Sequence, residues 1–257
     1  MLSYVFCLVR RARRPTLRRI AEGMPGGGAL RAIEVGDELW AIVQDVPERD
    51  YREAALARGL QNLDWVGPRA IAHEHVIESF LSANALLPMQ LFTLFNSDDR
   101  VLHHVRSDGA RIRRILKRVE NKLEWGLRLT YAEPKGPRSL ARRRRDVAGS
   151  AGLRSGAEYL ARRRDVLDVN HRRLRAARAA ADRVHTSMSR LAADSRRRTS
   201  LERAAPGSRL LLDAAFLVPS VSSGAFRARA RQQTRELRDA GVSVSLTGPW
   251  PPYNFIQ

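Results

Sequence analysis

Residues 246–255 read LTGPWPPYNF, and they set how the rest of the chain is interpreted. The four residues before them, VSVS, alternate apolar and polar side chains, which predicts a half-buried strand. We expect that strand to end at the Gly-Pro pair, because proline lacks the N–H that a strand ladder needs. The three prolines then favour an extended backbone that carries Trp250, Tyr253 and Phe255.

Three large aromatic side chains are unexpected in such a segment, since chain ends are commonly polar and frayed. One interpretation is a latch, in which Trp250, Tyr253 and Phe255 fold back over the C-terminal domain and complete its core. The other is that the rings enter a groove on another protein. The latch is favoured, because a segment that follows the last strand so closely has a short reach.

Composition sets the outer bounds. A chain of 257 residues with 44% hydrophobic residues can bury a core, and its length suits one large domain or two smaller ones. The formal net charge is +19, and all but three of the 46 basic residues are arginine. So uniform a preference for arginine over lysine is typical of the nucleotide composition of the source genome. The other interpretation of the positive charge is contact with a polyanion or an acidic protein.

A single cysteine, Cys7, excludes an intramolecular disulfide and a cysteine-cluster metal site. No run approaches the roughly 20 apolar residues that a membrane helix needs. Arginines follow the apolar run Leu2–Val9 rather than precede it, so it does not resemble a secretory signal. We therefore expect a soluble cytoplasmic protein.

The first half of the chain mixes strand and helix patterns. Apolar or alternating runs predict strands, helical periodicity predicts helices, and Ser97 is a helix-capping residue. The expected strands are residues 2–9, 30–35, 39–46 and 86–95, and the expected helices are 50–60, 68–84 and 97–121. This order predicts an N-terminal α+β domain over residues 1–121, a sandwich whose helices cover one face of a mainly antiparallel sheet.

The second half begins with a strand over residues 123–131, in which Trp125 and every second residue after it face one side. A Pro- and Gly-rich linker follows at 133–156. Residues 157–205 lack glycine and proline, and apolar residues recur there at seven-residue spacing, which predicts a long Arg-rich helix. A strand (210–218), a helix (222–240) and a last strand (242–246) complete a C-terminal domain over residues 122–257.

Three segments resemble signatures of the gas vesicle protein F/L family, in the right order. Residues 86–95, LLPMQLFTLF, match the first signature, although the family usually has arginine at the position of Gln90 and Phe-Gly in place of Leu91-Phe92. Residues 124–126, EWG, followed by an apolar-basic-apolar triplet, match the second. The terminal run GPWPPY matches the third and most specific one.

The resemblance implies a modified ferredoxin-like fold for the C-terminal domain. It also implies a minor structural or assembly protein of the gas vesicle, with neither cofactor nor catalysis. The implied partners are the major shell protein and other gas vesicle accessory proteins. Candidate interaction or latch residues are Trp250, Tyr253, Phe255, Trp125 and Gln90.

Two other classes of function are weaker. His73 and His75, like His103 and His104, are spaced so that they fall on different faces of a helix, and the chain has no hydrolase or phosphate-loop motif. We therefore expect no enzyme and no metal site. Nucleic acid binding, to RNA in particular, is the alternative function, because arginines outnumber acids between residues 138 and 209. It is disfavoured because the aromatic strand motif of RNA-binding sheets is missing.

Overall fold

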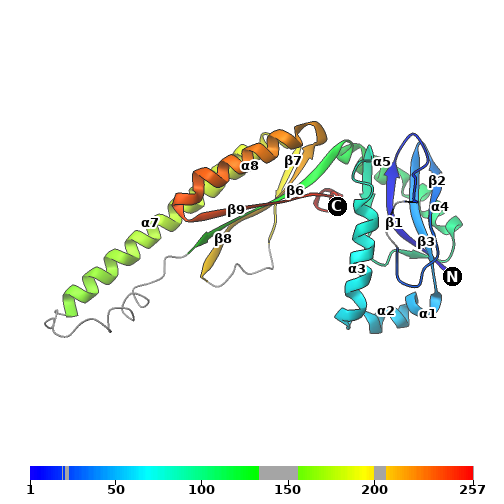
Figure 1. Cartoon of the computed structure of the whole chain (residues 1–257), viewed down its shortest axis with the longest axis horizontal. Coiled ribbons are helices and arrows are strands. Elements are labelled where there is room, and N and C mark those ends of the chain that lie inside the picture. Colours follow the sequence, from blue (N-terminus) through cyan, green and yellow to red (C-terminus); the bar gives the residue numbers. More distant parts are fainter. Residues whose placement is uncertain (19, 21–22, 133–155, 200–206, 257) are drawn as a thin grey trace. The chain divides into compact units, whose positions relative to one another are not determined.

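The computed structural model describes residues 1–18, 20, 23–132, 156–199 and 207–256 (Figure 1). Contacts between Cα atoms divide the α+β chain into two compact units. Unit 1 contains Met1–Glu124 and Gly248–Gln257, and unit 2 contains Trp125–Thr247. Unit 2 is therefore an insertion within unit 1. The linker expected at 133–156 lies outside the described residues, apart from Gly156.

The sheet of unit 1 has the strand order β2-β3-β1-β4, and β5 also pairs with β1. The apolar run at the start of the chain forms the central strand, which is antiparallel to β3, β4 and β5. The expected hairpin is confirmed, with a register shift between Glu34 and Gly36. The strands are β1 (Leu2–Arg10), β2 (Leu30–Gly36), β3 (Leu39–Val46), β4 (Ala85–Pro88) and β5 (Leu94–Phe95).

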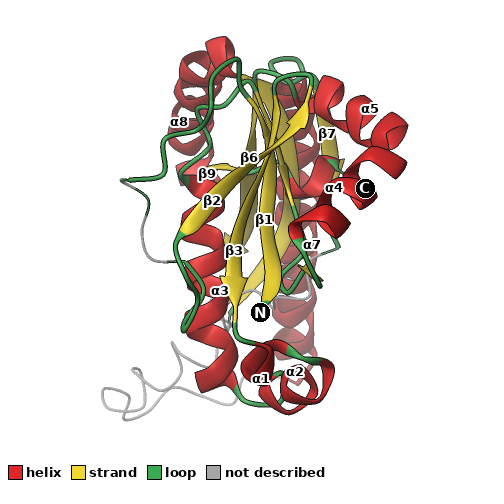
Figure 2. Ribbon diagram, turned by 90° about the vertical axis from the view of Figure 1, so that its right-hand side faces the viewer, coloured by secondary structure: helices red, strands yellow, loops and turns green. Residues whose placement is uncertain are grey.

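Helices cover both faces of this sheet, whereas we expected them on one face. Ser3 donates a hydrogen bond to Asp98 of α4, and its neighbour Tyr4 is bonded to His73 of α3. Adjacent strand residues point to opposite faces, so α3 and α4 lie on opposite sides, as Figure 2 shows. The helices are α1 (Glu48–Tyr51), α2 (Glu53–Gly59), α3 (Leu63–Glu78), α4 (Asp98–Ser107) and α5 (Gly109–Val119).

Unit 2 is built on a sheet with the order β7-β8-β6-β9. Alternate residues of β6 and β8 face the helices α7 and α8 and form one buried cluster with them. The expected strand face is confirmed, because Trp125, Leu127, Leu129 and Tyr131 are all buried. The elements are β6 (Lys122–Ala132), α7 (Gly156–Ser189), β7 (Asp194–Arg197), β8 (Ser208–Pro219), η1 (Ser220–Ser222), α8 (Ser223–Leu237), η2 (Arg238–Ala240) and β9 (Val242–Trp250).

Helix boundaries in unit 1 differ from those expected. The helix expected over 50–60 is divided into α1 and α2, and α3 ends at Glu78 rather than at residue 84. The Asn62 side chain accepts a hydrogen bond from the Asp64 N–H (2.9 Å), so α3 starts five residues before Pro68, which lies inside the helix. The helix expected over 97–121 is interrupted at Asp108, whose ψ of 14° leaves helical geometry. Ser97 does cap it, accepting a hydrogen bond from the Arg100 N–H.

The strands of unit 2 also hold two corrections. The long helix ends at Ser189, and the charged segment DSRR forms β7, which periodicity could not reveal because it has no apolar residue. The last strand does not stop at the Gly248-Pro249 pair but continues to Trp250. β9 is an outer strand of its sheet, which is where prolines within sheets are found.

A buried carboxylate on the second face of this sheet holds three segments of unit 2 together. The side chain of Asp213 is 3% exposed, and it accepts hydrogen bonds from Arg198 Nε (2.9 Å) and Arg128 (3.1 Å). Burial acts to raise the pKa of Asp213, but the hydrogen bonds and charges of the two guanidinium groups outweigh it. The pKa of this carboxyl therefore lies below its ordinary value, and the group stays ionised.

We expect Asp213→Asn to destabilise the protein by about 1.5–3 kcal/mol at neutral pH, the typical contribution of hydrogen bonds to a charged group. A lowered folded-state pKa contributes stability above the unfolded value of about 3.9, and this contribution is lost as pH falls through the folded-state value. Urea unfolding between pH 2 and pH 7 measures it. The difference in free energy of unfolding between the native protein and the variant should become smaller in acid. A difference that does not depend on pH would contradict this account. Asp182→Asn, which removes an exposed ion pair with Arg197, is the control and should change stability by less than about 1 kcal/mol.

Candidate functional site

The aromatic and proline-rich tail packs within unit 1 and not over unit 2, where the latch interpretation placed it. Pro251, Pro252 and Phe255 are buried, and Phe255 is 0% exposed. Trp250 is 40% exposed. The short turn η3 (Tyr253–Phe255) directs Phe255 inward. Of the three aromatic residues that the latch interpretation placed in a core, Trp250 is therefore the most exposed and Phe255 is the one that is fully buried.

Tyr253 ties the tail to helix α3. Its hydroxyl donates to the carboxylate of Glu74, with O···O distances of 2.9 and 2.8 Å. Burial and the neighbouring Glu74 carboxylate raise the pKa of Tyr253, so the phenol stays protonated and acts as a donor. Burial also raises the pKa of Glu74, although the hydrogen bond from Tyr253 opposes that rise. Two weakly hydrated groups thus satisfy each other.

A second carboxylate, that of Glu124, holds the next residue of the tail. Glu124 is 2% exposed and accepts hydrogen bonds from the backbone N–H of Asn254 (2.8 Å) and from its side-chain amide. The other two residues of the EWG signature serve unit 2: Trp125 lies in its buried cluster, and a Cβ at Gly126 would lie 2.6 Å from the Thr247 hydroxyl. This signature therefore supports the tail and the close approach of β9 to β6.

The 86–95 segment is a strand interrupted by a loop. β4 and β5 both pair with β1, and the chain leaves the ladder between them. The Met89 N–H donates to the Phe6 carbonyl, and the Val5 N–H donates to the Thr93 carbonyl, both at 2.9 Å. Residues 90–92 are therefore looped out of the sheet, and the expected single strand over 86–95 is corrected.

His73 holds this loop in place. Its Nε2 lies 3.2 Å from the Met89 carbonyl, which only accepts, so Nε2 carries the proton. Nδ1 must then accept from the Tyr4 hydroxyl (2.8 Å), which in turn accepts from the Phe92 N–H (3.1 Å). Burial lowers the pKa of His73, which favours this neutral form. Both ring nitrogens of His73 therefore have hydrogen-bond partners within unit 1.

Phe92 explains one departure from the family pattern. Its φ is 66°, in the left-handed region that favours glycine, and the family usually has glycine at this position. The phenylalanine ring packs against Trp65, with centroids 5.5 Å apart, and the Arg69 guanidinium lies 3.8 Å from the Trp65 ring centre. The chain thus adopts a left-handed turn that glycine would adopt without strain, and the phenylalanine adds an aromatic contact.

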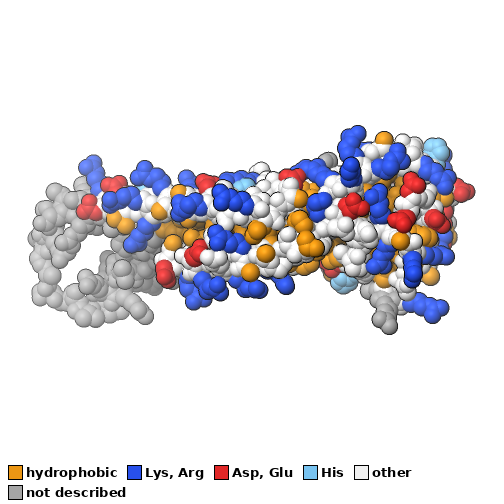
Figure 3. All heavy atoms as spheres, turned by 90° about the horizontal axis from the view of Figure 1, so that it is seen from above, with side chains coloured by type: hydrophobic (Ala, Val, Ile, Leu, Met, Phe, Trp, Pro, Cys, Tyr) orange, Lys and Arg blue, Asp and Glu red, His pale blue; other side chains and the backbone are white. Residues whose placement is uncertain are grey.

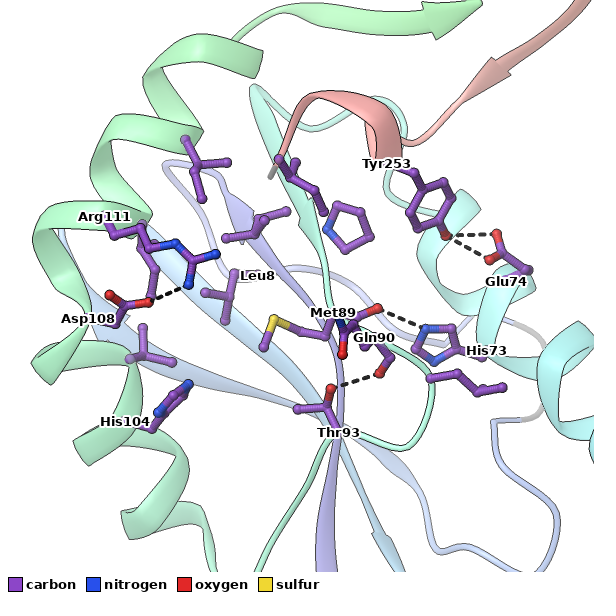
Figure 4. A pocket seen from close by; sticks show the side chains of 17 residues that line it. Leu8, His73, Glu74, Met89, Gln90, Thr93, His104, Asp108, Arg111 and Tyr253 are labelled. Atoms are coloured by element: carbon purple, nitrogen blue, oxygen red, sulfur yellow. Dashed lines mark hydrogen bonds and ion pairs between the residues drawn. The ribbon is translucent and has the colours of Figure 1, made fainter. Parts of the chain in front are cut away.

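The loop and the tail line one pocket of about 680 Å³ (Figure 4). Of the expected site residues, Gln90 and Tyr253 meet here, Gln90 with an exposed side chain. Apolar side chains from β4, α5 and the tail make up much of the wall: Leu87, Pro88, Met89, Leu91, Ile112, Ile115 and Ile256. Polar groups, including Glu74, Thr93 and Arg111, are also in the lining. Such a pocket suits an apolar side chain with polar neighbours.

Two of the charged side chains in the pocket lining are paired with other groups of unit 1. Arg111 is paired with Asp108 at 3.3 Å, and Glu74 is paired with Tyr253. Cys7 is fully buried, and burial raises the pKa of its thiol. Across the described parts of the chain, no three His, Cys, Asp or Glu side chains cluster as a metal site would require. None of the described helices combines the length and apolarity needed to span a membrane.

Comparisons with known proteins decide the family. The family model described as gas vesicle synthesis protein GvpL/GvpF matches residues 2–257. The chain belongs to this family. A gas vesicle protein L from a Streptomyces species is 34% identical over 263 residues, spanning 99% of this chain and 92% of the relative. GvpL/GvpF proteins are structural proteins of gas vesicle assembly.

Solved structures agree on the fold. The crystal structure of GvpF from an Anabaena species matches with a TM-score of 0.67 at 13% identity, covering 100% of this chain and 96% of that one. GvpF from Microcystis aeruginosa matches with a TM-score of 0.64 at 12% identity, covering 100% and 99%. The α+β fold with antiparallel sheets is thus shared within the GvpL/GvpF family.

Sequence reasoning missed Glu74, Glu124 and Asn254 as the residues that hold the tail. In the sequence, Glu74 lies between His73 and His75, which helix geometry places on different faces, and Glu124 is part of the EWG signature. A usable signal was present, because an uncharged tail rich in N–H and O–H donors needs acceptors, and a buried carboxylate needs donors. Their pairing joins residues more than a hundred positions apart, which local patterns do not reveal.

We expect the ranking of tail substitutions to follow burial. Phe255→Ala should destabilise the protein by about 3–5 kcal/mol, as other buried aromatic truncations do. Trp250→Ala removes a side chain of a residue that is 40% exposed and should cost less, about 1–2 kcal/mol. Urea denaturation of the three proteins measures the difference. A Trp250→Ala loss equal to that of Phe255→Ala would contradict the packing described here.

A second pair of substitutions tests the left-handed turn. Phe92→Gly and Phe92→Ala both lose the contact with Trp65, but only alanine keeps a Cβ at positive φ. We expect the glycine variant to be the more stable of the two by about 1 kcal/mol, the cost of this conformation for an L-residue. Thermal unfolding compares them. Equal stability, or an advantage for alanine, would show that the turn relaxes when the ring is removed.

Proposed function

We propose that this protein assists gas vesicle assembly through protein contacts, with the shell protein and other gas vesicle accessory proteins as partners. The observation that carries the proposal is the convergence of two family signatures, the 86–95 loop and the tail, on one pocket of unit 1. Tail and loop are each fixed by internal hydrogen bonds, so the pocket is preformed and little ordering entropy opposes binding. An apolar side chain of a partner fits its lining.

We also propose that the two units act as two domains, an N-terminal α/β sandwich and a C-terminal modified ferredoxin-like domain. Two observations support the second assignment. The elements β6, α7, β7, β8, α8 and β9 follow the order βαββαβ, and the sheet places the first and third of these strands in the centre. The long α7 is the modification, and the tail beyond Thr247 returns to the first domain.

The pocket is tested by placing a charge in its wall. Leu91 and Ile115 are half-buried lining residues, so the double variant Leu91→Asp/Ile115→Asp should fold and yet reject an apolar side chain. Burying one such side chain contributes about 1.5–3 kcal/mol, so we expect at least a tenfold loss of affinity for the shell protein in a pull-down titration. Vesicle yield in cells that depend on the variant should fall with it.

The matched control is Leu63→Asp, which charges an apolar residue of unit 1 that is 85% exposed and lies outside the pocket lining. It should leave binding and vesicle yield unchanged. A double variant that keeps its melting temperature and still binds the shell protein at the native level would refute the pocket as the contact site.

A further inference from the structure

The strand β9 is an unusual outer strand. Its one neighbour among the described residues is β6, so its other edge carries backbone groups without a ladder partner. Charged residues make up 28% of the chain, yet none lies between Gly241 and Gln257. Natural outer strands are usually protected by charges, by prolines or by being short, because a free edge templates pairing with another chain.

The opposite edge of the same sheet shows that protection. β7 has four residues, of which Asp194, Arg196 and Arg197 are charged. β9 has nine residues, and its first proline is Pro249. The two edges belong to the same unit and share its arginine-rich setting, so the absence of charge is particular to β9. Within the part of the chain that the structure describes, no strand pairs with the outer edge of the six-residue stretch Val242–Thr247 of unit 2.

The register identifies the groups that this edge presents. The Ala132 N–H donates to the Gly241 carbonyl (3.0 Å), and Gly126 lies against Thr247, six residues along each strand. Hydrogen-bonding direction alternates along an antiparallel strand, so Ser243 and Ser245 direct their backbone groups toward β6. Val244 and Leu246 therefore direct theirs away from the sheet. These are the donors and acceptors that an added strand would use.

The apolar side chains beside this edge could be covered by an added strand. Val244 and Leu246 are partly buried and pack at the border of the unit 2 core, and Leu237 of α8 does the same. Ser243, Ser245 and Thr247 lie on the opposite face and are exposed. A strand added outside β9, with alternate apolar residues facing the helices, would extend the core of unit 2. It would also bury the exposed parts of the Val244, Leu246 and Leu237 side chains.

We propose that the Val242–Thr247 edge of β9 binds an extended segment of a partner protein by strand addition. This segment has alternate apolar residues and is uncharged or acidic elsewhere. The acidic preference follows from α8 and η2, which lead into β9 and carry Arg227, Arg229, Arg231, Arg235 and Arg238 against Glu236 and Asp239. Figure 3 shows basic side chains spread along this unit. The inference goes beyond the pocket of unit 1, because it concerns a different surface.

A second copy of the chain is the less favourable occupant. Antiparallel pairing of two β9 strands about a two-fold axis would place both sets of helices on the same face of one continuous sheet. The two arginine-rich α8 helices would then approach each other across the axis, and like charges oppose that arrangement. Overall, each copy also carries +19.

The test is hydrogen exchange on the full-length protein with a defined probe, the capped peptide DVTVTVD, and a matched peptide, DVTPTVD, whose central proline removes a ladder donor. With DVTVTVD in excess, the amides of Val244 and Leu246 should exchange at least tenfold more slowly, and DVTPTVD should leave them unchanged. Equal effects of the two peptides, or no slowing at β9, would overturn the proposal.

Protein variants separate backbone pairing from side-chain contact. Val244→Pro removes an outward N–H, and Val244→Ala shortens the same side chain but keeps the N–H. We expect the proline variant to bind the peptide at least tenfold more weakly than the alanine variant, and equal binding would overturn strand addition. Should Val244→Pro fail to fold, Ser243→Glu places a negative charge at an exposed position beside the edge and should weaken binding of the acidic peptide, with Val221→Glu, 95% exposed elsewhere in unit 2, as control.

Two further outcomes have defined meanings. Concentration-dependent dimers with Val244 and Leu246 protected before any peptide is added would identify a second copy as the occupant and overturn the partner assignment. The Leu91→Asp/Ile115→Asp variant should bind the peptide normally, since its changes lie in unit 1. Failure of pocket binding and failure of β9 binding are thus distinguishable.

Discussion

A single buried carboxylate, that of Glu124, sets the position of the end of the chain. It accepts hydrogen bonds from the backbone and side-chain N–H groups of Asn254, and a carboxylate so deeply buried would be costly without them. The following residue, Trp125, already belongs to unit 2. Glu124 is therefore both the last residue before the chain enters unit 2 and the residue to which the tail is hydrogen-bonded. The placing of Tyr253 and Ile256 in the pocket wall depends on this attachment.

The pocket itself depends on a second polar chain, from Phe92 through Tyr4 and His73 to Met89. Each group in that chain both satisfies a neighbour and fixes the looped-out residues of the 86–95 segment. One ring nitrogen of His73 must accept while the other donates, which requires the neutral imidazole. Burial lowers the pKa of His73 and so favours that form. The polar residues of the site thus serve to orient an apolar surface.

Local patterns in the sequence were sufficient for the elements whose apolar residues repeat. β1, the β2–β3 hairpin, the β6 face and the stripe of α7 at Ala177, Ala181, Val184 and Met188 lie where periodicity places them. The charged strand β7 has no such signal. The tail was assigned to the wrong partner because hydrogen bonds from Tyr253 and Asn254 to Glu74 and Glu124 span more than a hundred residues. Gln90 and Tyr253 were selected from separate signatures, and only the three-dimensional fold brings them to one pocket.

The insertion of unit 2 within unit 1 has a consequence for synthesis on the ribosome. Chains emerge from the N-terminus, and domains usually fold in that order. Here Phe255, a fully buried residue of unit 1, is made only after all of Trp125–Thr247. Unit 1 therefore lacks part of its core until the whole of unit 2 has been synthesised, and emergence of the tail becomes the step that completes the core of unit 1.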